Sequence, residues 1–308
     1  MIAHSQKTAA RPSLGAWLRD PEPRTPAQAR VQQFWLMWRK LRRNGSAMLG
    51  LALLLAIIAA AIFAPYLSTH GIYAQNLGNR LQPPSAANWL GTDELGRDIY
   101  SRTLHGARIT LYIAFLTAAI SAPIGLIVGT LSGYFGGIVD TVLMRVTEIF
   151  LAFPSLILAL AFVAALGPGI ENAIIAISLA AWPPIARLAR AETMMIRRSD
   201  YIAAVRLQGA SAMRVIVLHI APMCVPSVVA RVTLNMASII LTAAGLGFLG
   251  LGAQPPSPEW GAMLSSARQF ILSHGHVAAV PGMAILLTSI AFNLVGDGLR
   301  DVLDPRNE

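Results

Sequence analysis

Six long apolar runs constrain the fold of this 308-residue chain more than any other feature of its sequence. They cover residues 47–68, 109–132, 146–166, 172–186, 215–244 and 277–295. A helix needs about 20 mainly apolar residues to cross the hydrocarbon core of a bilayer. Only 13% of the residues are charged, whereas a typical soluble domain has about 25%. The sequence therefore predicts an all-α membrane protein with six transmembrane helices.

The 24 Lys and Arg residues are distributed unevenly around these runs. Eighteen lie before the first run, after the second or fourth run, or at the C-terminal end, and five lie in the alternating connections. Positive charge marks the cytoplasmic side of a membrane protein, so both termini are predicted to be cytoplasmic. The net charge of +9 then reflects orientation, and no nucleic-acid partner is expected. More than 40 residues precede the first run, which favours an uncleaved anchor over a signal peptide.

The chain is expected to divide into four segments along its length. Residues 1–24 contain three prolines among polar residues and are predicted to be a mobile tail. Thr25-Pro26 then predicts the start of an amphipathic helix that lies in the membrane interface or packs on the spans. The segments are a cytoplasmic tail with this helix at 1–44, a first transmembrane helix at 45–69, an extracytoplasmic segment at 70–107, and a five-helix core at 108–308 with a cytoplasmic loop near 190–214.

The sequence lacks the motifs of nucleotide-binding or catalytic proteins. Gly245, Gly247 and Gly250 match GxGxxG, but they lie in an apolar run without the following acidic residue that a dinucleotide site requires. The phosphate-binding loop of ATPases requires a lysine, and the only lysines lie at positions 7 and 40. His274 and His276 are too few ligands to predict a metal site. We therefore expect no catalytic residue, no cofactor and no metal in this chain.

Arg231 is the clearest ionisable residue inside a predicted span, and Glu148 lies near the start of another. An Arg at the centre of a span costs about 2.5–3.5 kcal/mol on insertion scales, so it normally faces a polar cavity or a partner. Both residues are candidates for a translocation path. For Arg231, an interhelical ion pair or a side chain that reaches the cytoplasmic face is an equal alternative. The scarcity of carboxylates in the spans argues against a proton-coupled carrier.

Residues 197–209 predict a short helix on the cytoplasmic side between the fourth and fifth runs. Ser199 or Asp200 can cap such a helix, and Gly209 can end it. The small residues in its middle allow close insertion into a groove on another protein.

This stretch resembles the EAA-type coupling loop of binding-protein-dependent ABC importers. Ala203, Ala204, Val205 and Gly209 occupy motif positions, and residues 220–222 match the motif's ending. Ala203 stands where the family often has Glu. Residues 91–102, 247–261 and 292–306 resemble further segments of dipeptide, oligopeptide and nickel permeases, with the order expected of the second permease of a pair.

The resemblance implies a type I ABC importer permease with a MetI-like fold in the bacterial inner membrane. It implies four kinds of partner: a second homologous permease, two ATPases that carry ATP and Mg, an extracytoplasmic binding protein, and the bilayer. Small peptides are the expected cargo, with glutathione or nickel complexes as alternatives and a self-powered secondary transporter as a remote one. The ATPase-coupling residues that it implies are Asp200, Tyr201, Ile202, Ala203, Ala204, Val205, Arg206 and Gly209.

Two long outward connections, residues 70–107 and 250–276, are candidates for contact with the binding protein or for an outer gate. The first is predicted to contain a short helix near residues 98–104. Capping and turn formation are an equal alternative for the polar residues of both connections. The candidate contact residues are Asp93, Arg97, Asp98, Gln254, Glu259 and Trp260.

Overall fold

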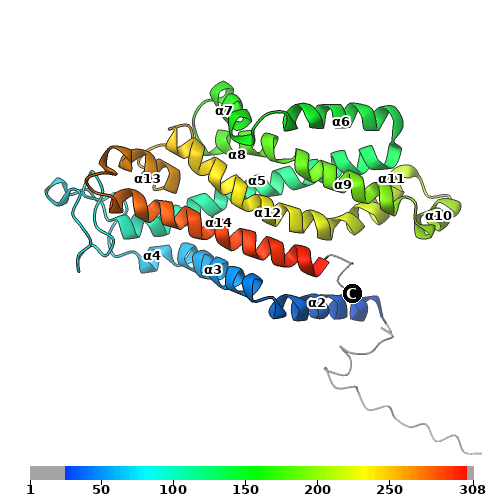
Figure 1. The fold of residues 1–308 in the computed structure, drawn as a ribbon, viewed down its shortest axis with the longest axis horizontal. Coiled ribbons are helices and arrows are strands. Elements are labelled where there is room, and N and C mark those ends of the chain that lie inside the picture. The colour runs from blue at the N-terminus through cyan, green and yellow to red at the C-terminus, as the bar shows by residue number, and fades with distance from the viewer. Residues whose placement is uncertain (1–24, 304–308) are drawn as a thin grey trace, which may run out of the picture.

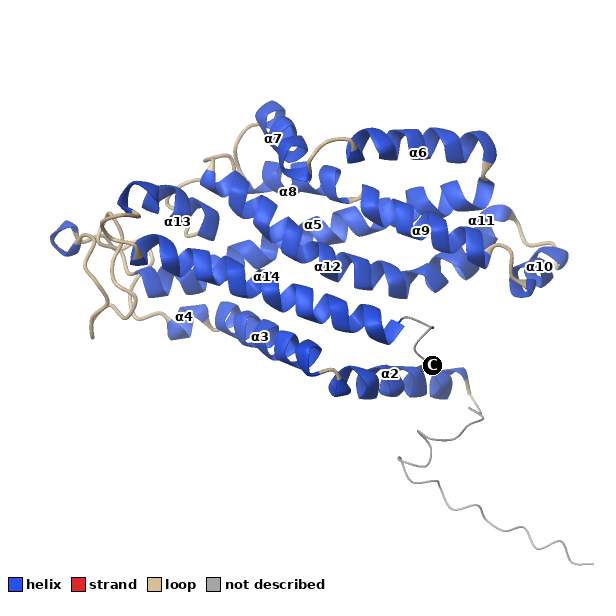
Figure 2. Ribbon diagram, viewed as in Figure 1, coloured by secondary structure: helices blue, strands red, loops and turns tan. Residues whose placement is uncertain are grey.

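The computed structural model describes residues 25–303, so the predicted tail at 1–24 lies outside the described residues. Within this range the chain forms helices joined by loops, and its only extended pairing is an isolated bridge between Thr92 and Asp98 (Figure 2). The helices form an elongated bundle (Figure 1). The all-α prediction is confirmed.

Among residues 25–303, five helical segments are long and apolar enough to cross a membrane, and a sixth candidate is a bent pair of helices. Two of the five are interrupted: the third consists of α8 and α9, and the fourth of α11, a π-helical turn and α12. The five segments are α3 (Gly45–Ile62), α5 (Ile99–Phe135), α8 (Ile170–Ala181) with α9 (Pro183–Ile196), α11 (Ala212–Val215) with η2 (Ile216–Ile220) and α12 (Ala221–Phe248), and α14 (His276–Leu303).

The bent pair replaces the single third span that the sequence predicted. It consists of α6 (Gly137–Leu151) and α7 (Ser155–Leu166), and the two helix axes meet at 92°. Pro154 directly precedes α7. Proline has no N–H to donate and its ring clashes with the carbonyl four residues earlier, so α6 cannot continue through it. The run at 146–166 is therefore discontinuous.

The centre of the bundle is the packing of α5 against α9. Gly125, Gly129 and Gly133 recur every four residues on the face of α5 that meets α9. A Cβ atom on Gly129 would lie 2.6 Å from the Cβ of Ala189. Small residues at this spacing let two transmembrane helices approach closely, which is a main source of association energy in a bilayer.

The N-terminal helix α2 (Pro26–Arg43) begins as predicted, because the Thr25 side chain accepts a hydrogen bond from the N–H of Gln28. It contacts α3 and α14. Both α2 and the C-terminal end of α14 lie toward the end of the bundle that carries α10 (Asp200–Leu207) (Figure 1). The two described ends of the chain therefore share one side, and its assignment to the cytoplasm stays a prediction.

The opposite end of the bundle carries the two long connections (Figure 1). They contain η1 (Leu77–Asn79), α13 (Trp260–Ala267) and η3 (Arg268–Phe270), and α4 (Ala64–Leu67) directly precedes the first. The predicted short helix near residues 98–104 is not separate, since it is the first part of α5. Polar residues thus extend this helix well beyond its apolar run.

Candidate coupling helix and transmembrane groove

The structure confirms the short helix between the fourth and fifth spans. Ser199 caps α10 by accepting a hydrogen bond from the N–H of Ile202. Gly209 follows the helix with φ at +83°, in the left-handed region that glycine adopts without steric cost. Both predicted boundary signals therefore act as expected.

One face of α10 is anchored to the bundle. Ile202 is fully buried in a cluster with Val215 and Ile220, and the Tyr201 hydroxyl lies 2.7 Å from Nδ1 of His219. The guanidinium of Arg206 lies 4.9 Å from the centre of the Tyr134 ring, within the range of a cation–π contact. Of the predicted coupling residues, Ile202, Tyr201 and Arg206 thus bind the helix to its own chain.

The other face of α10 is free in the described part of the chain. Asp200, Ala203 and Ala204 are exposed, Val205 is half-buried, and Leu207 is 89% exposed. Leu207 is thus the most exposed large apolar side chain of α10, beside exposed small residues. It was not predicted from the sequence as a coupling residue.

An ion pair connects α9, which leads into α10, to α6. Arg190 Nε lies 2.5 Å from Asp140 Oδ1, and a second nitrogen of its guanidinium donates to Oδ2 at 2.6 Å. The Ser132 hydroxyl of α5 donates to the same carboxylate. Such a two-pronged contact fixes orientation as well as distance. This Asp140–Arg190 pair therefore couples three helices beside α10.

A groove follows one face of α12. It consists of a cavity of about 330 Å³ and an adjoining cavity of about 210 Å³, and Arg231 lines both. The larger lies between α9, α12 and α14, and the smaller between α7, α8, the start of α9 and α12. Ser155, the first residue of α7, lines the smaller cavity. The break in the bent helix pair thus lies at the wall of the groove.

The α12 wall of the groove is a stripe of polar residues in a mainly apolar helix. Its members follow one another at spacings of three or four residues: Ser227, Arg231, Asn235, Ser238 and Thr242. This spacing places them on one helix face. Only Arg231 was predicted from the sequence, although the same spacing in the run 215–244 would have shown the whole stripe.

The two candidate path residues lie at different places in the structure. Arg231 forms no ion pair with any described residue, which leaves the predicted interhelical pair without support. Glu148 is exposed on α6 and pairs with Arg145 at 3.2 Å, and it does not line either cavity of the groove. The structure therefore brings Arg231, and not Glu148, to the groove.

Asp93, Arg97 and Asp98 are buried in the first outer connection. Arg97 Nε lies 2.6 Å from Asp93 Oδ2, and a guanidinium nitrogen of Arg102 contacts the same segment through the carbonyl of Ile72. Asp98 caps α5 by accepting from the N–H of Ser101. These side chains hold the connection together, which is the structural alternative stated for them.

The second connection contains the other three candidate contacts. Glu259 caps α13 by accepting from the N–H groups of Gly261 and Ala262, and Trp260 donates from its indole nitrogen to the carbonyl of Thr103 at 3.0 Å. Both are buried, whereas Gln254 is exposed. Of the six candidates, only Gln254 presents an exposed side chain, and its contact with a partner stays a prediction.

Among residues 25–303, no group of three or more His, Cys, Asp or Glu side chains is placed to hold a metal ion. The rings of His274 and His276 lie 6.4 Å apart in an edge-to-face contact.

Comparison with known proteins identifies the family. Residues 121–308 match the family described as "Binding-protein-dependent transport system inner membrane component". The chain belongs to this family. Residues 32–84 also match the N-terminal transmembrane domain of oligopeptide transport permease C. The protein is thus a multi-pass permease of the inner membrane, as the coupling loop predicted.

Relatives that carry peptides cover almost the whole permease. It is 42% identical over 293 residues to the dipeptide transport system permease protein DppC of Alkalihalophilus pseudofirmus, which covers 94% of this chain and 96% of the relative. It is 43% identical to the glutathione transport system permease protein GsiD of Pectobacterium atrosepticum, over 94% of each chain. A third relative is the probable D,D-dipeptide permease DdpC of Escherichia coli, 42% identical over 92% of this chain and 95% of the relative.

A solved structure confirms the predicted fold. The permease resembles a chain in an inward-facing structure of the MetNI methionine ABC transporter with a TM-score of 0.55 at 22% identity. The alignment covers 67% of this permease and 98% of that chain.

Proposed function

We propose that this permease imports small peptides as one half of the membrane pathway of an ABC importer. A second homologous permease supplies the other half, two ATPases bind and hydrolyse ATP with Mg, and an extracytoplasmic binding protein delivers the peptide. The names of the relatives support the cargo, because dipeptides, D,D-dipeptides and glutathione are all short peptides. The observation that carries the proposal is α10, which is anchored on one face and free on the other.

The proposed mechanism begins at α10. When ATP closes the ATPase dimer, the exposed face of α10 follows the ATPase to which it is docked. Ile202 and the cation–π contact of Arg206 carry that movement to the base of the bundle. The Asp140–Arg190 pair carries it to α5 and α6. The polar stripe of α12 then lines the path that opens and closes.

The first test is purification of the tagged permease from its native membrane in mild detergent. We expect a second permease and ATPases to co-purify, with vanadate-sensitive ATP hydrolysis. The reconstituted complex should import dialanine into liposomes when peptide-loaded binding protein and ATP are present. Import by this chain alone, without ATPases, would contradict the proposal and favour a secondary transporter.

A further inference from the structure

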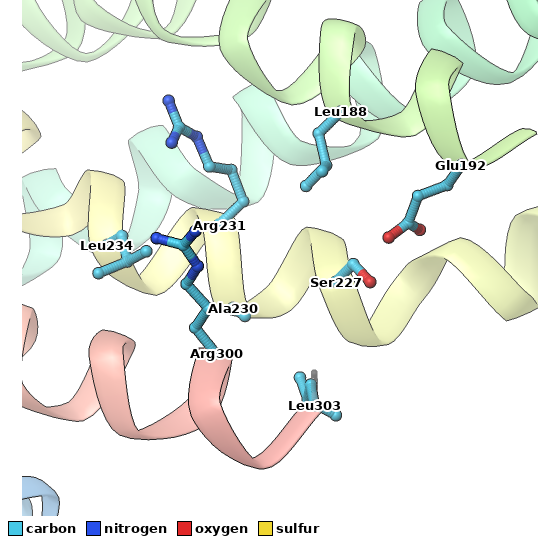
Figure 3. A pocket seen from close by; sticks show the side chains of 8 residues that line it. All are labelled: Leu188, Glu192, Ser227, Ala230, Arg231, Leu234, Arg300 and Leu303. Carbon is cyan, nitrogen blue, oxygen red and sulfur yellow. The ribbon is translucent and has the colours of Figure 1, made fainter. Parts of the chain in front are cut away.

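The larger cavity of the groove contains an unusual set of charges. Arg231 of α12 and Arg300 of α14 line it, together with Glu192 and Leu188 of α9. Figure 3 shows Arg300 extending from α14 toward α12, where Arg231 is attached, while the Glu192 carboxylate points from α9 toward Ser227. Three helices that are distant in sequence therefore place two cations and one anion around one space.

The two arginines have no acidic partner among the described residues. In this they differ from Arg97 and Arg190, whose guanidinium groups are satisfied by carboxylates. Two like charges that line one cavity repel each other, and the repulsion grows where protein or lipid lowers the dielectric constant. An anionic group between them would relieve that repulsion, and a guanidinium offers paired donors to a carboxylate.

The opposite wall of the cavity carries the complementary charge. Glu192 is half-buried, and its carboxylate points toward Ser227 across the cavity (Figure 3). Leu188, Leu234 and Leu303 supply the apolar part of the cavity wall. The cavity therefore has positive charge from α12 and α14, negative charge from α9, and an apolar remainder.

We propose that this cavity is a subsite for a zwitterionic peptide. Arg231 and Arg300 bind the C-terminal carboxylate, and Glu192 binds the N-terminal ammonium. This rests on the proposed function, and it adds that the permease itself recognises both charged ends of its cargo. The cavity volume of about 330 Å³ lies within the roughly 300–1,000 Å³ of small-ligand sites. The smaller cavity beyond Arg231 provides room for side chains.

A binding measurement tests the cavity without transport. Cys224 is the single native cysteine, so the variant C224A/L188C carries one thiol, at the cavity wall. In the purified complex, without ATP or binding protein, dialanine should slow labelling of this thiol by a small maleimide. Dialaninamide and N-acetyldialanine, which each lack one charged end, should protect about tenfold less well, as expected for loss of one charge-assisted hydrogen-bonded contact. A thiol in the second outer connection, C224A/L272C, where Leu272 is fully exposed, serves as the control that dialanine should not protect.

The arginines are tested by adding R231Q/R300Q to the labelled variant and by transport. Protection by dialanine should then be lost, and R231K/R300K should restore part of it because the charge returns. Dialanine uptake per ATP hydrolysed should fall about tenfold in R231Q/R300Q. R187Q removes an exposed charge of α9 that does not line the cavity, so it should leave uptake unchanged.

Three results would overturn the inference: no protection by dialanine, equal protection by dialaninamide or by inorganic phosphate, or unchanged protection in R231Q/R300Q. Equal protection by phosphate would identify a general anion site such as one for a lipid headgroup. The failure of the proposed function is separate, because it would appear as absent dialanine uptake by the unmodified complex. The labelling experiment tests whether the cavity binds dialanine whether or not the complex transports it.

Discussion

Gly209 adopts a backbone conformation in the turn after α10 that few other residues could adopt without strain. Its φ of +83° lies in the left-handed region, yet a Cβ at this position would meet no atom within 4 Å. A side chain there would therefore strain the backbone and would not collide with neighbours. Left-handed backbone costs an ordinary L-residue about 1–2 kcal/mol, whereas Asn tolerates it better.

This difference gives a graded prediction at Gly209. In G209V, the turn after α10 should change conformation, so ATP hydrolysis should continue while uptake falls. G209N should keep most of the uptake, because Asn adopts the left-handed region more easily than a β-branched residue. The measurement is the ratio of dialanine imported to ATP hydrolysed in proteoliposomes. Equal ratios in G209V and the unmodified complex would show that this turn does not transmit the movement.

Glu259 gives a prediction about pH. Burial raises the pKa of its carboxyl from an ordinary 4.5 to about 7, although the N–H groups of Gly261 and Ala262 act in the opposite direction. Between these values the folded chain retains a proton that the unfolded chain has released, so the free energy of unfolding decreases as pH rises from about 4.5 to about 7.

The variant E259Q should weaken this dependence, because Gln does not titrate. Thermal unfolding in detergent at about pH 5 and about pH 8 should show a smaller difference in midpoint for E259Q than for the unmodified protein. E171Q, at an exposed position in the first turn of α8, should retain the full difference. A pH dependence in E259Q as large as in the unmodified protein would assign the effect to another group.

At the scale of helices, the Asp140–Arg190 pair predicts a measurable coupling energy. Its side chains are about a quarter to a third exposed, so its strength should lie between the ~0–1 kcal/mol of surface pairs and the ~3–5 kcal/mol lost when a buried pair is broken. A double-mutant cycle with D140N and R190Q should give about 1–2 kcal/mol. The exposed Arg145–Glu148 pair should give less, and equal values for the two pairs would contradict the difference in burial.

The close α5–α9 contact predicts that one methyl group added at Gly129 destabilises the protein. In G129A the new Cβ would lie 2.6 Å from the Cβ of Ala189, so the helices must separate, at a cost of about 1–3 kcal/mol. The unfolding midpoint should fall. In the control G282A the nearest atom is a Leu264 methyl at 3.9 Å, so the midpoint should stay close to that of the unmodified protein.

Sequence patterns predicted elements whose signals are local. The cap at Ser199, the end at Gly209 and the start at Thr25 all depend on residues within one turn, and the structure confirms them. The pairing of Asp140 with Arg190 could not be predicted in this way, because it joins residues 50 positions apart on two spans. The break at Pro154 was missed because the apolar composition continues across it and outweighed the proline.

In the outer connections, sequence patterns likewise failed to predict which charged residues are buried. Asp93 and Arg97 are charged residues in a loop, a pattern typical of an exposed contact surface. The structure places both inside the connection, where they satisfy each other. Burial of a polar loop residue depends on which distant parts of the chain pack around it, and residue spacing in the sequence does not reveal those contacts.

For the whole molecule, the distribution of basic residues predicts an orientation that labelling can test. Leu272 is fully exposed in the second outer connection, and Leu207 is exposed on α10 at the other end of the bundle. In intact spheroplasts, C224A/L272C should react with a membrane-impermeant maleimide. C224A/I138C, at an exposed position in the first turn of α6 that is not part of α10, should react only after permeabilisation. The reverse pattern would show that the termini are outside.

The glycine contact between α5 and α9 has a consequence for how far a small movement reaches. At 1.5 Å per residue, the 37 residues of α5 span roughly 55 Å. Along Gly125–Gly133 the two helices are held at nearly backbone distance and so move together. A rotation of α5 at this end displaces its other end in proportion to the length of the helix. A tilt of about 5° at α10 would displace the outer end of a roughly 55 Å helix by about 5 Å, which is comparable to the width of an extended peptide chain.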